Sequence, residues 1–337
     1  MYLRLPLLQS LHLLSARVLT SVSISSRHNK GATRELEVDE RDHERDSVNR
    51  RMEAAGPCSR GRGREHTVLW RMGQGETVIC VHGVPTSGFL YRKLLPELAS
   101  RGLEGVTLDL PGLGLAGRPA DFDYSWSGLA AWYLKAIDAA GIINFHLVVH
   151  DIGGPIGFDV IRRVPDRVKS LTVLNTLVDV SQFQRPWVME PFAWPVIGRL
   201  WLQSARTLMF YFLIRTYGTR NINRAEADAY GQLLLRLDSG RAFLQIMRSF
   251  ERTPAFEQGI KAALKARKFP AQIIWGKDDP ALRMKKYAPH LLKALDLESY
   301  EAVYGKHFLQ EDSSHAIASL IARMISALSS SVEQLSW

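Results

Sequence analysis

Short apolar runs alternate with helical patterns over most of the chain from residue 67 onward. Five runs are continuously apolar, at residues 77–83, 105–110, 145–151, 170–175 and 271–275. A strand has this pattern when both faces of its sheet are buried, which is typical of a parallel sheet. Helical spacing is found between them, at about 88–101, 125–140 and 154–163. The sequence therefore predicts an α/β fold of successive strand–helix units, with a mostly parallel sheet flanked by helices.

This alternation stops after Asn175 and resumes at residue 271. Residues 180–250 carry Trp, Phe, Leu and Arg at helical spacing and contain no strand-like run. We therefore expect an inserted helical cap at residues 179–251, within a core formed by residues 67–178 and 252–330. The last expected elements are a helix after Pro280, a short strand at 298–303 and a helix at 313–328.

The first 66 residues have a different composition from the rest. Residues 1–34 contain five basic residues, no acidic residue and six serines, which is typical of a mitochondrial transit peptide. Residues 35–65 are charged, then rich in Gly and Arg, and lack periodicity, as in a disordered linker. An alternative is that translation begins at Met52 or Met72. We expect a disordered or targeting extension and a cytoplasmic protein, or a mitochondrial one if the extension is a real transit peptide.

Charge and cysteine content remove several other classes of function. The formal net charge is +9, but basic residues are scattered among acidic ones and form no stripe with aromatic residues, so we expect no nucleic-acid partner. No apolar run reaches the length of a membrane span. The two cysteines, Cys58 and Cys80, provide neither a disulfide framework nor a metal site.

The stretch around Asp151 predicts a strand, a sharp turn and a helix. Asp151 ends the apolar run at 145–151 and is followed by Gly153 and Gly154, which open the next helical segment. A nucleophile elbow places its reactive side chain at the top of such a turn. Val149 occupies a position where many elbows have glycine, so the pattern is half matched. The alternative is a plain turn in which Asp151 caps the helix.

Three further polar features follow predicted strands, at the sheet edge where open α/β proteins place their sites. They are the turn that begins at His82, the acidic pair Asp278 and Asp279, and His307. The order Asp151, Asp279, His307 is the nucleophile–acid–histidine order of a hydrolase triad. Asp278 is the alternative acid.

Other histidines have simpler interpretations. We expect His82 and His150 to make structural hydrogen bonds at the two turns, and His315 to lie on the surface.

An aspartate in the nucleophile position carries chemical information of its own. A serine that attacked a saturated carbon would form an ether, which water does not readily cleave. Aspartate instead forms an ester, which a base-activated water hydrolyses. Asp151 therefore favours displacement at a saturated carbon.

From about residue 67 to 330 the chain resembles the α/β-hydrolase superfamily, and most closely its haloalkane dehalogenase and epoxide hydrolase branch. The matching motifs are at residues 82–87, 90–93, 109–114, 150–154, 225–230, 275–279 and 307–310. This resemblance implies a hydrolase without cofactor or metal that combines a small apolar organic substrate with water. It also implies that Asp151 attacks, that His307 activates water, that Asp279 orients His307, and that the backbone N–H groups of Val84 and Ile152 stabilise the oxyanion.

Two departures from the family bear on the substrate. Haloalkane dehalogenases usually have tryptophan after the nucleophile, where this chain has Ile152, and many have asparagine where it has Val84. Epoxide hydrolases also usually carry that tryptophan. The candidate substrate-binding residues of the cap are Trp187, Trp194, Tyr211, Tyr217 and Tyr230, each of which has core packing as its alternative. We expect a haloalkane dehalogenase-like hydrolase, with an epoxide hydrolase as the first alternative and a non-catalytic ligand-binding protein as the second.

Overall fold

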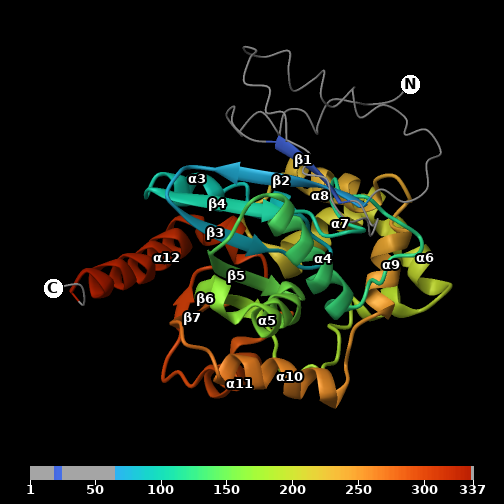
Figure 1. The fold of residues 1–337 in the computed structure, drawn as a ribbon. Helices are drawn as coiled ribbons and strands as arrows, with labels where there is room; N and C mark the ends of the chain where they lie inside the picture. The colour runs from blue at the N-terminus through green and yellow to red at the C-terminus, as the bar shows by residue number, and fades with distance from the viewer. Residues whose placement is uncertain (1–18, 25–64, 335–337) are drawn as a thin grey trace, which may run out of the picture.

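A computed structural model describes residues 19–24 and 65–334, and an eight-stranded sheet forms its centre (Figure 1). The strands lie in the order β1-β2-β4-β3-β5-β6-β7-β8. Their bounds are β1 Leu19–Ile24, β2 Glu65–Met72, β3 Glu76–Val81, β4 Leu103–Leu108, β5 Phe145–Asp151, β6 Val168–Thr176, β7 Ala271–Gly276 and β8 Glu301–Val303. Strand β2 pairs antiparallel with β1 and β4, and all other pairs are parallel. The mostly parallel sheet predicted from the apolar runs is confirmed.

Helices cover both faces of this sheet (Figure 1). Helices α4, α5, α10 and α11 pack in a row, whereas α3 packs against α12. Their bounds are α3 Leu94–Ala99, α4 Trp126–Ala139, α5 Gly153–Arg163, α10 Pro254–Lys265, α11 Met284–Leu295 and α12 Leu309–Gln334, with short 3-10 turns η1 Gly88–Tyr91 and η2 Pro165–Arg167. The core between these layers includes the fully buried side chains of Trp126 and Trp275.

The chain between β6 and β7 contains helices and no strand, as its sequence pattern predicts. Besides α10, these elements are η3 Glu190–Ala193, α6 Ile197–Leu202, η4 Gln203–Arg206, α7 Leu208–Leu213, the π-helical turn η5 Ile214–Gly218, α8 Arg224–Leu235 and α9 Arg241–Arg248. They gather at one end of the sheet (Figure 1). Helix α8 begins at a capping box in which Asn223 and Glu226 exchange side-chain and backbone hydrogen bonds, which stabilises its first turn.

Part of the amino-terminal extension, which we expected to lie outside the fold, belongs to the sheet. Strand β1, at residues 19–24, extends the sheet through antiparallel pairing with β2, and β2 itself begins at Glu65. The composition of residues 1–34 is typical of a transit peptide, so the sequence did not predict this short strand. The rest of the predicted extension, with Met52 and Cys58, lies outside the described residues.

A buried ionic cluster links the inserted segment to the rest of the fold. Arg92, which follows η1, donates from Nη2 to Glu226 of α8 at 2.6 Å and to Glu311 of α12 at 2.9 Å. Its Nη1 donates to the other oxygen of Glu311. Tyr230 of α8 donates its hydroxyl to Glu311 at 2.6 Å. Because all four side chains are largely removed from water, each charge depends on its partners.

We expect Arg92→Leu to lower the free energy of unfolding by about 3–5 kcal/mol, since it leaves two buried carboxylates without their guanidinium. Chemical denaturation measures this change. The control is Arg323→Leu, because the pair between Arg323 and Glu301 is exposed on both sides and contributes less than about 1 kcal/mol. Equal effects of the two substitutions would contradict the structural role of the cluster.

Candidate active site

Asp151 stands at a strained turn between β5 and α5. Its φ of 53° lies in the left-handed region, which side chains other than glycine rarely adopt. The turn is closely packed, because a Cβ at Gly83 would lie 2.2 Å from Oδ1 of Asp151. Val149 stands where many elbows have glycine. Its side chain packs closely against Gly157 of α5, where a Cβ would lie only 2.4 Å from Val149 Cγ1. The strained backbone therefore presents the carboxylate above the sheet, as a nucleophile elbow does.

The two oxygens of the Asp151 carboxylate have different surroundings. Oδ1 accepts the backbone N–H of Val84 at 2.8 Å, and the N–H of Ile152 also hydrogen-bonds the carboxylate. Oδ2 lies 3.4 Å from Nε2 of His307. The Val84 N–H thus holds Oδ1, while Oδ2 faces the histidine.

His307 connects this carboxylate to a second one. Its Nδ1 donates to Oδ2 of Asp279 at 2.9 Å, and both side chains are buried. The other oxygen of Asp279 accepts the N–H groups of Ala281 and Leu282, at 2.7 and 2.9 Å. Asp279 is therefore fixed and holds the Nδ1 proton of His307, so that Nε2 is the ring nitrogen that faces Asp151.

Asp278, the alternative acid, points elsewhere. It lies 3.5 Å from the guanidinium of Arg220 in a partly exposed ion pair. Asp279 is thus the member of the acidic pair that the fold brings to His307.

A shell of polar groups positions the loop that carries His307. His150 donates from Nε2 to the backbone carbonyl of His307 at 2.8 Å, and the amide of Asn175 donates to the same carbonyl at 3.2 Å. His82 accepts the N–H of Leu110 at 3.0 Å. His82 and His150 therefore make the structural hydrogen bonds that we predicted. Sequence reasoning missed Asn175, although its place at the end of a predicted strand was a usable signal.

The electrostatics of the site keep the carboxylate ionised. Burial disfavours the ionised form of Asp151, but the hydrogen bond and charge of His307 outweigh burial and hold the pKa of the carboxyl below its usual range. Burial also acts against the charged form of His307, yet the negative charge of Asp279 and the hydrogen bond to Asp151 raise its pKa to about 10. Burial lowers the pKa of His150 to about 3, so its ring is neutral.

The pair of Asp151 and His307 opens onto a mainly apolar cavity of about 90 Å³. From the core, its wall includes Val84, Ile152, Leu282 and Phe308. From the inserted segment, its wall includes Phe183, Met189, Phe192, Phe210, Tyr217 and Phe250. No tryptophan or asparagine belongs to this wall, and the side chains of Ile152 and Val84 have no hydrogen-bond donor.

The predicted cap residues have different positions relative to this cavity. Tyr217 lines it, and Trp187 lies edge-on to Tyr217 with ring centroids 6.1 Å apart. Trp187 is 69% exposed and Trp194 is 46% exposed, and neither lines the cavity. Tyr211 hydrogen-bonds Arg215 on the surface.

Tyr230 also lies outside the cavity wall. Its hydroxyl is committed to Glu311, and its ring stacks on Phe308 with centroids 5.9 Å apart. Tyr230 therefore packs against Phe308, a residue of the cavity wall, without lining the cavity itself. Sequence reasoning missed Arg185, a basic residue of the wall for which helical spacing gave no signal.

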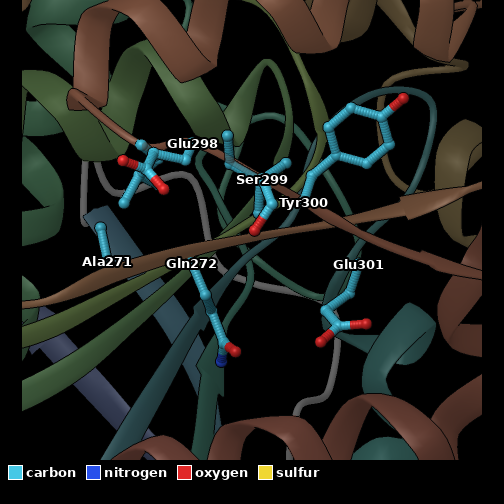
Figure 2. Close-up of a pocket in the computed structure, with 8 residues that line it drawn as sticks. Ala271, Gln272, Glu298, Ser299, Tyr300 and Glu301 are labelled. Carbon is cyan, nitrogen blue, oxygen red and sulfur yellow. The ribbon is translucent and has the colours of Figure 1, made fainter.

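A second hollow lies at the opposite end of the strands (Figure 2). It is formed by Ala271 and Gln272, at the start of β7, and by residues 297–301 before and at the start of β8. No group of the triad reaches it. Within the described residues, no cluster of His, Cys, Asp or Glu has the arrangement of a metal site, and no helix is long and apolar enough to cross a membrane.

Comparisons with known proteins identify the family of this chain. The alpha/beta hydrolase fold family matches residues 76–314. A haloalkane dehalogenase from Psychrobacter cryohalolentis is 26% identical over 265 residues, which cover 74% of this chain and 83% of that protein. A cis-3-alkyl-4-alkyloxetan-2-one decarboxylase from Shewanella oneidensis is 27% identical over 272 residues, which cover 73% and 80%. A structure assigned as an epoxide hydrolase from Pseudomonas aeruginosa has a TM-score of 0.65 at 20% identity, with coverage of 79% and 93%.

The chain belongs to the alpha/beta hydrolase fold family. Haloalkane dehalogenases are among its relatives, at 26–27% identity, and the chain is a hydrolase enzyme. The predictions of fold, branch and enzyme class are confirmed. Relatives of similar identity bear the names of different reactions, so the substrate has to be inferred from the site.

Proposed function

We propose that the protein hydrolyses a bond at a saturated carbon through an ester on Asp151, in the manner of a haloalkane dehalogenase. The observation that carries this proposal is the Asp151 carboxylate itself, on a strained elbow, with Oδ1 held by the Val84 N–H and Oδ2 beside His307 at the apolar cavity. The names of the relatives support the same class of reaction.

In the first step Oδ2 of Asp151 displaces the leaving group, which departs with the electron pair of its bond to carbon. In the second step His307 takes a proton from water through Nε2, and the resulting hydroxide attacks the ester carbonyl carbon. The Val84 N–H already holds Oδ1, and the Ile152 N–H also hydrogen-bonds the carboxylate, so both are placed to stabilise the oxyanion that develops. Collapse of this intermediate releases the alcohol and restores the Asp151 carboxylate.

We also propose that residues 179–251 act as a cap over the reaction. Their aromatic and aliphatic side chains form the cavity wall opposite the triad. An apolar wall excludes water from the attacking carboxylate until the ester has formed. It also favours a small apolar organic substrate.

The two steps differ in their pH dependence. Asp151 has a lowered pKa and is ionised throughout the neutral range, so ester formation does not change there. Ester hydrolysis needs neutral His307, and its pKa of about 10 falls once Asp151 is esterified and uncharged. We expect kcat to rise from neutral pH toward the alkaline range, while kcat/KM stays flat. A rapid-quench series across pH tests this, and a kcat that falls as pH rises would contradict it.

Tyr217 favours an epoxide hydrolase as the second candidate function, because it is the one predicted tyrosine that lines the cavity. A phenol there is able to protonate the oxygen of an opening epoxide ring. A parallel assay of bromobutane, chlorobutane and styrene oxide separates the candidates. Halide release supports the lead proposal, and diol formation alone supports the second. Tight binding of these compounds without turnover would identify a non-catalytic ligand-binding protein.

A further inference from the structure

Arg185 places a guanidinium in the wall of the otherwise apolar cavity. It lies between β6 and η3, and its side chain is only 4% exposed. Burial of a charged group costs free energy unless partners compensate for it. The hydrogen-bond partners of this guanidinium therefore show whether the protein alone compensates for its burial.

The hydrogen bonds of Arg185 satisfy only part of its guanidinium. Nη2 donates to the backbone carbonyl of Met247 near the end of α9, at 2.5 Å. Nη1 lies 3.4 Å from a carboxylate oxygen of Glu190, which is 41% exposed. Nε is buried and has no hydrogen-bond partner within the described part of the chain. The protein partners of this buried cation thus leave part of its donor capacity unused.

The charge near Arg185 is also incompletely balanced. Burial is the main cause that lowers the pKa of this group, and the nearby positive charge of Arg252 lowers it further. Glu190 opposes these effects. The ring of Phe250 lies under the guanidinium, with Cζ 4.7 Å from the ring centroid, and holds its plane. A fixed cation with an unused donor at an apolar cavity is a site for an anion.

The chemistry of this site defines the anion. A single guanidinium matches a monoanion, because a dianionic phosphate would leave a second charge buried without a partner. The other residues of the wall are mostly apolar and match a hydrocarbon chain. The ionised carboxylate of Asp151 lines the same cavity and repels a second carboxylate beside it, so the anion binds apart from the reacting carbon.

We propose that Arg185 binds a carboxylate and makes the enzyme selective for substrates that carry a carboxylate at the far end of an apolar chain from the reacting carbon. This inference rests on the proposed function for its chemical step. Its binding step does not, because a nonreactive carboxylate occupies the same place.

Calorimetric titration of the whole protein with hexanoate and with hexanol tests the binding step without turnover. We expect hexanoate to bind roughly tenfold to a hundredfold more tightly than hexanol, as a hydrogen bond between charged groups would give. Arg185→Met should remove this preference, and Arg185→Lys should restore part of it. Arg248→Met is the control, because it removes an exposed arginine of α9 that does not line the cavity.

A merely structural Arg185 would give a different result. If the residue only caps α9 through the Met247 carbonyl, Arg185→Met lowers the melting temperature but leaves the ratio of the two affinities unchanged, which overturns the proposal. Equal binding of hexanoate and hexanol to the wild type overturns it as well. In a second arm, kcat/KM for 6-bromohexanoate is compared with that for bromohexane. Carboxylate binding without halide release from either compound would support Arg185 as the anion site and contradict the proposed function.

Discussion

Replacement of His307 by Gln is expected to stop the enzyme after its first chemical step and to leave the alkyl group on Asp151. Attack by Oδ2 needs only the ionised carboxylate, and the Val84 N–H continues to hold Oδ1 in the variant. Hydrolysis needs a base at the position of Nε2, 3.4 Å from Oδ2, and glutamine does not supply one. Loss of a general base typically slows a step by about a hundredfold to ten-thousandfold.

Intact-mass measurement after exposure to bromobutane should show one added butyl group, and peptide mapping should place it on Asp151. His315→Gln is the matched control, because His315 is exposed and contacts Glu97 and Arg101 on the surface. The control should turn over normally without an adduct. Normal turnover of His307→Gln, or an adduct on another residue, would refute the assigned roles.

The second large effect concerns the leaving group. The cavity wall contains no tryptophan or asparagine, and Ile152 and Val84 present apolar side chains there. Loss of a donor aimed at a developing negative charge typically costs on the order of 3 kcal/mol, or roughly a hundredfold to a thousandfold in rate. We therefore expect bromides and iodides to react much faster than chlorides, since their weaker carbon–halogen bonds need less assistance from the enzyme.

Ile152→Trp should reduce this preference, because an indole N–H beside the nucleophile stabilises the departing halide. The quantity to measure is the ratio of kcat/KM for bromobutane to that for chlorobutane, since general damage from the larger ring affects both substrates alike. Ile152→Leu is the control, which changes shape without adding a donor and should keep the wild-type ratio. Equal rates on chloride and bromide in the wild type would contradict the leaving-group argument.

The sheet, and the meeting of the three proposed triad residues at one edge of it, follow from the sequence for definable reasons. Strands buried on both faces leave continuous apolar runs, and such runs precede or end at Asp279 and Asp151, whereas the strand before His307 is short and mostly exposed. Parallel strands end at the same edge, so Asp151, Asp279 and His307 converge although they are far apart in the chain. The roles assigned to these three residues remain predictions that the experiments above test.

The inserted segment was harder to interpret. Helical spacing shows that its aromatic residues lie on helices, but it does not show which face of each helix meets the triad. Tyr217 lines the cavity, whereas the hydroxyl of Tyr230 is committed to Glu311. The partners of a side chain are set by long-range contacts, as between Arg92 and Glu226, and local pattern carries no information about them. The position of Arg185 in the cavity wall was not predictable for the same reason.

The central claim, that Asp151 forms an ester with the substrate, is tested most directly by a single turnover in heavy-oxygen water with enzyme in excess. Because water attacks the ester carbonyl, the heavy atom should enter the Asp151 carboxylate, and the first alcohol released should carry the ordinary isotope from Asp151. Mass spectrometry of the product and of the peptide that contains Asp151 measures both. Heavy oxygen in the first alcohol, with none in Asp151, would show direct attack by water on carbon and would contradict the account.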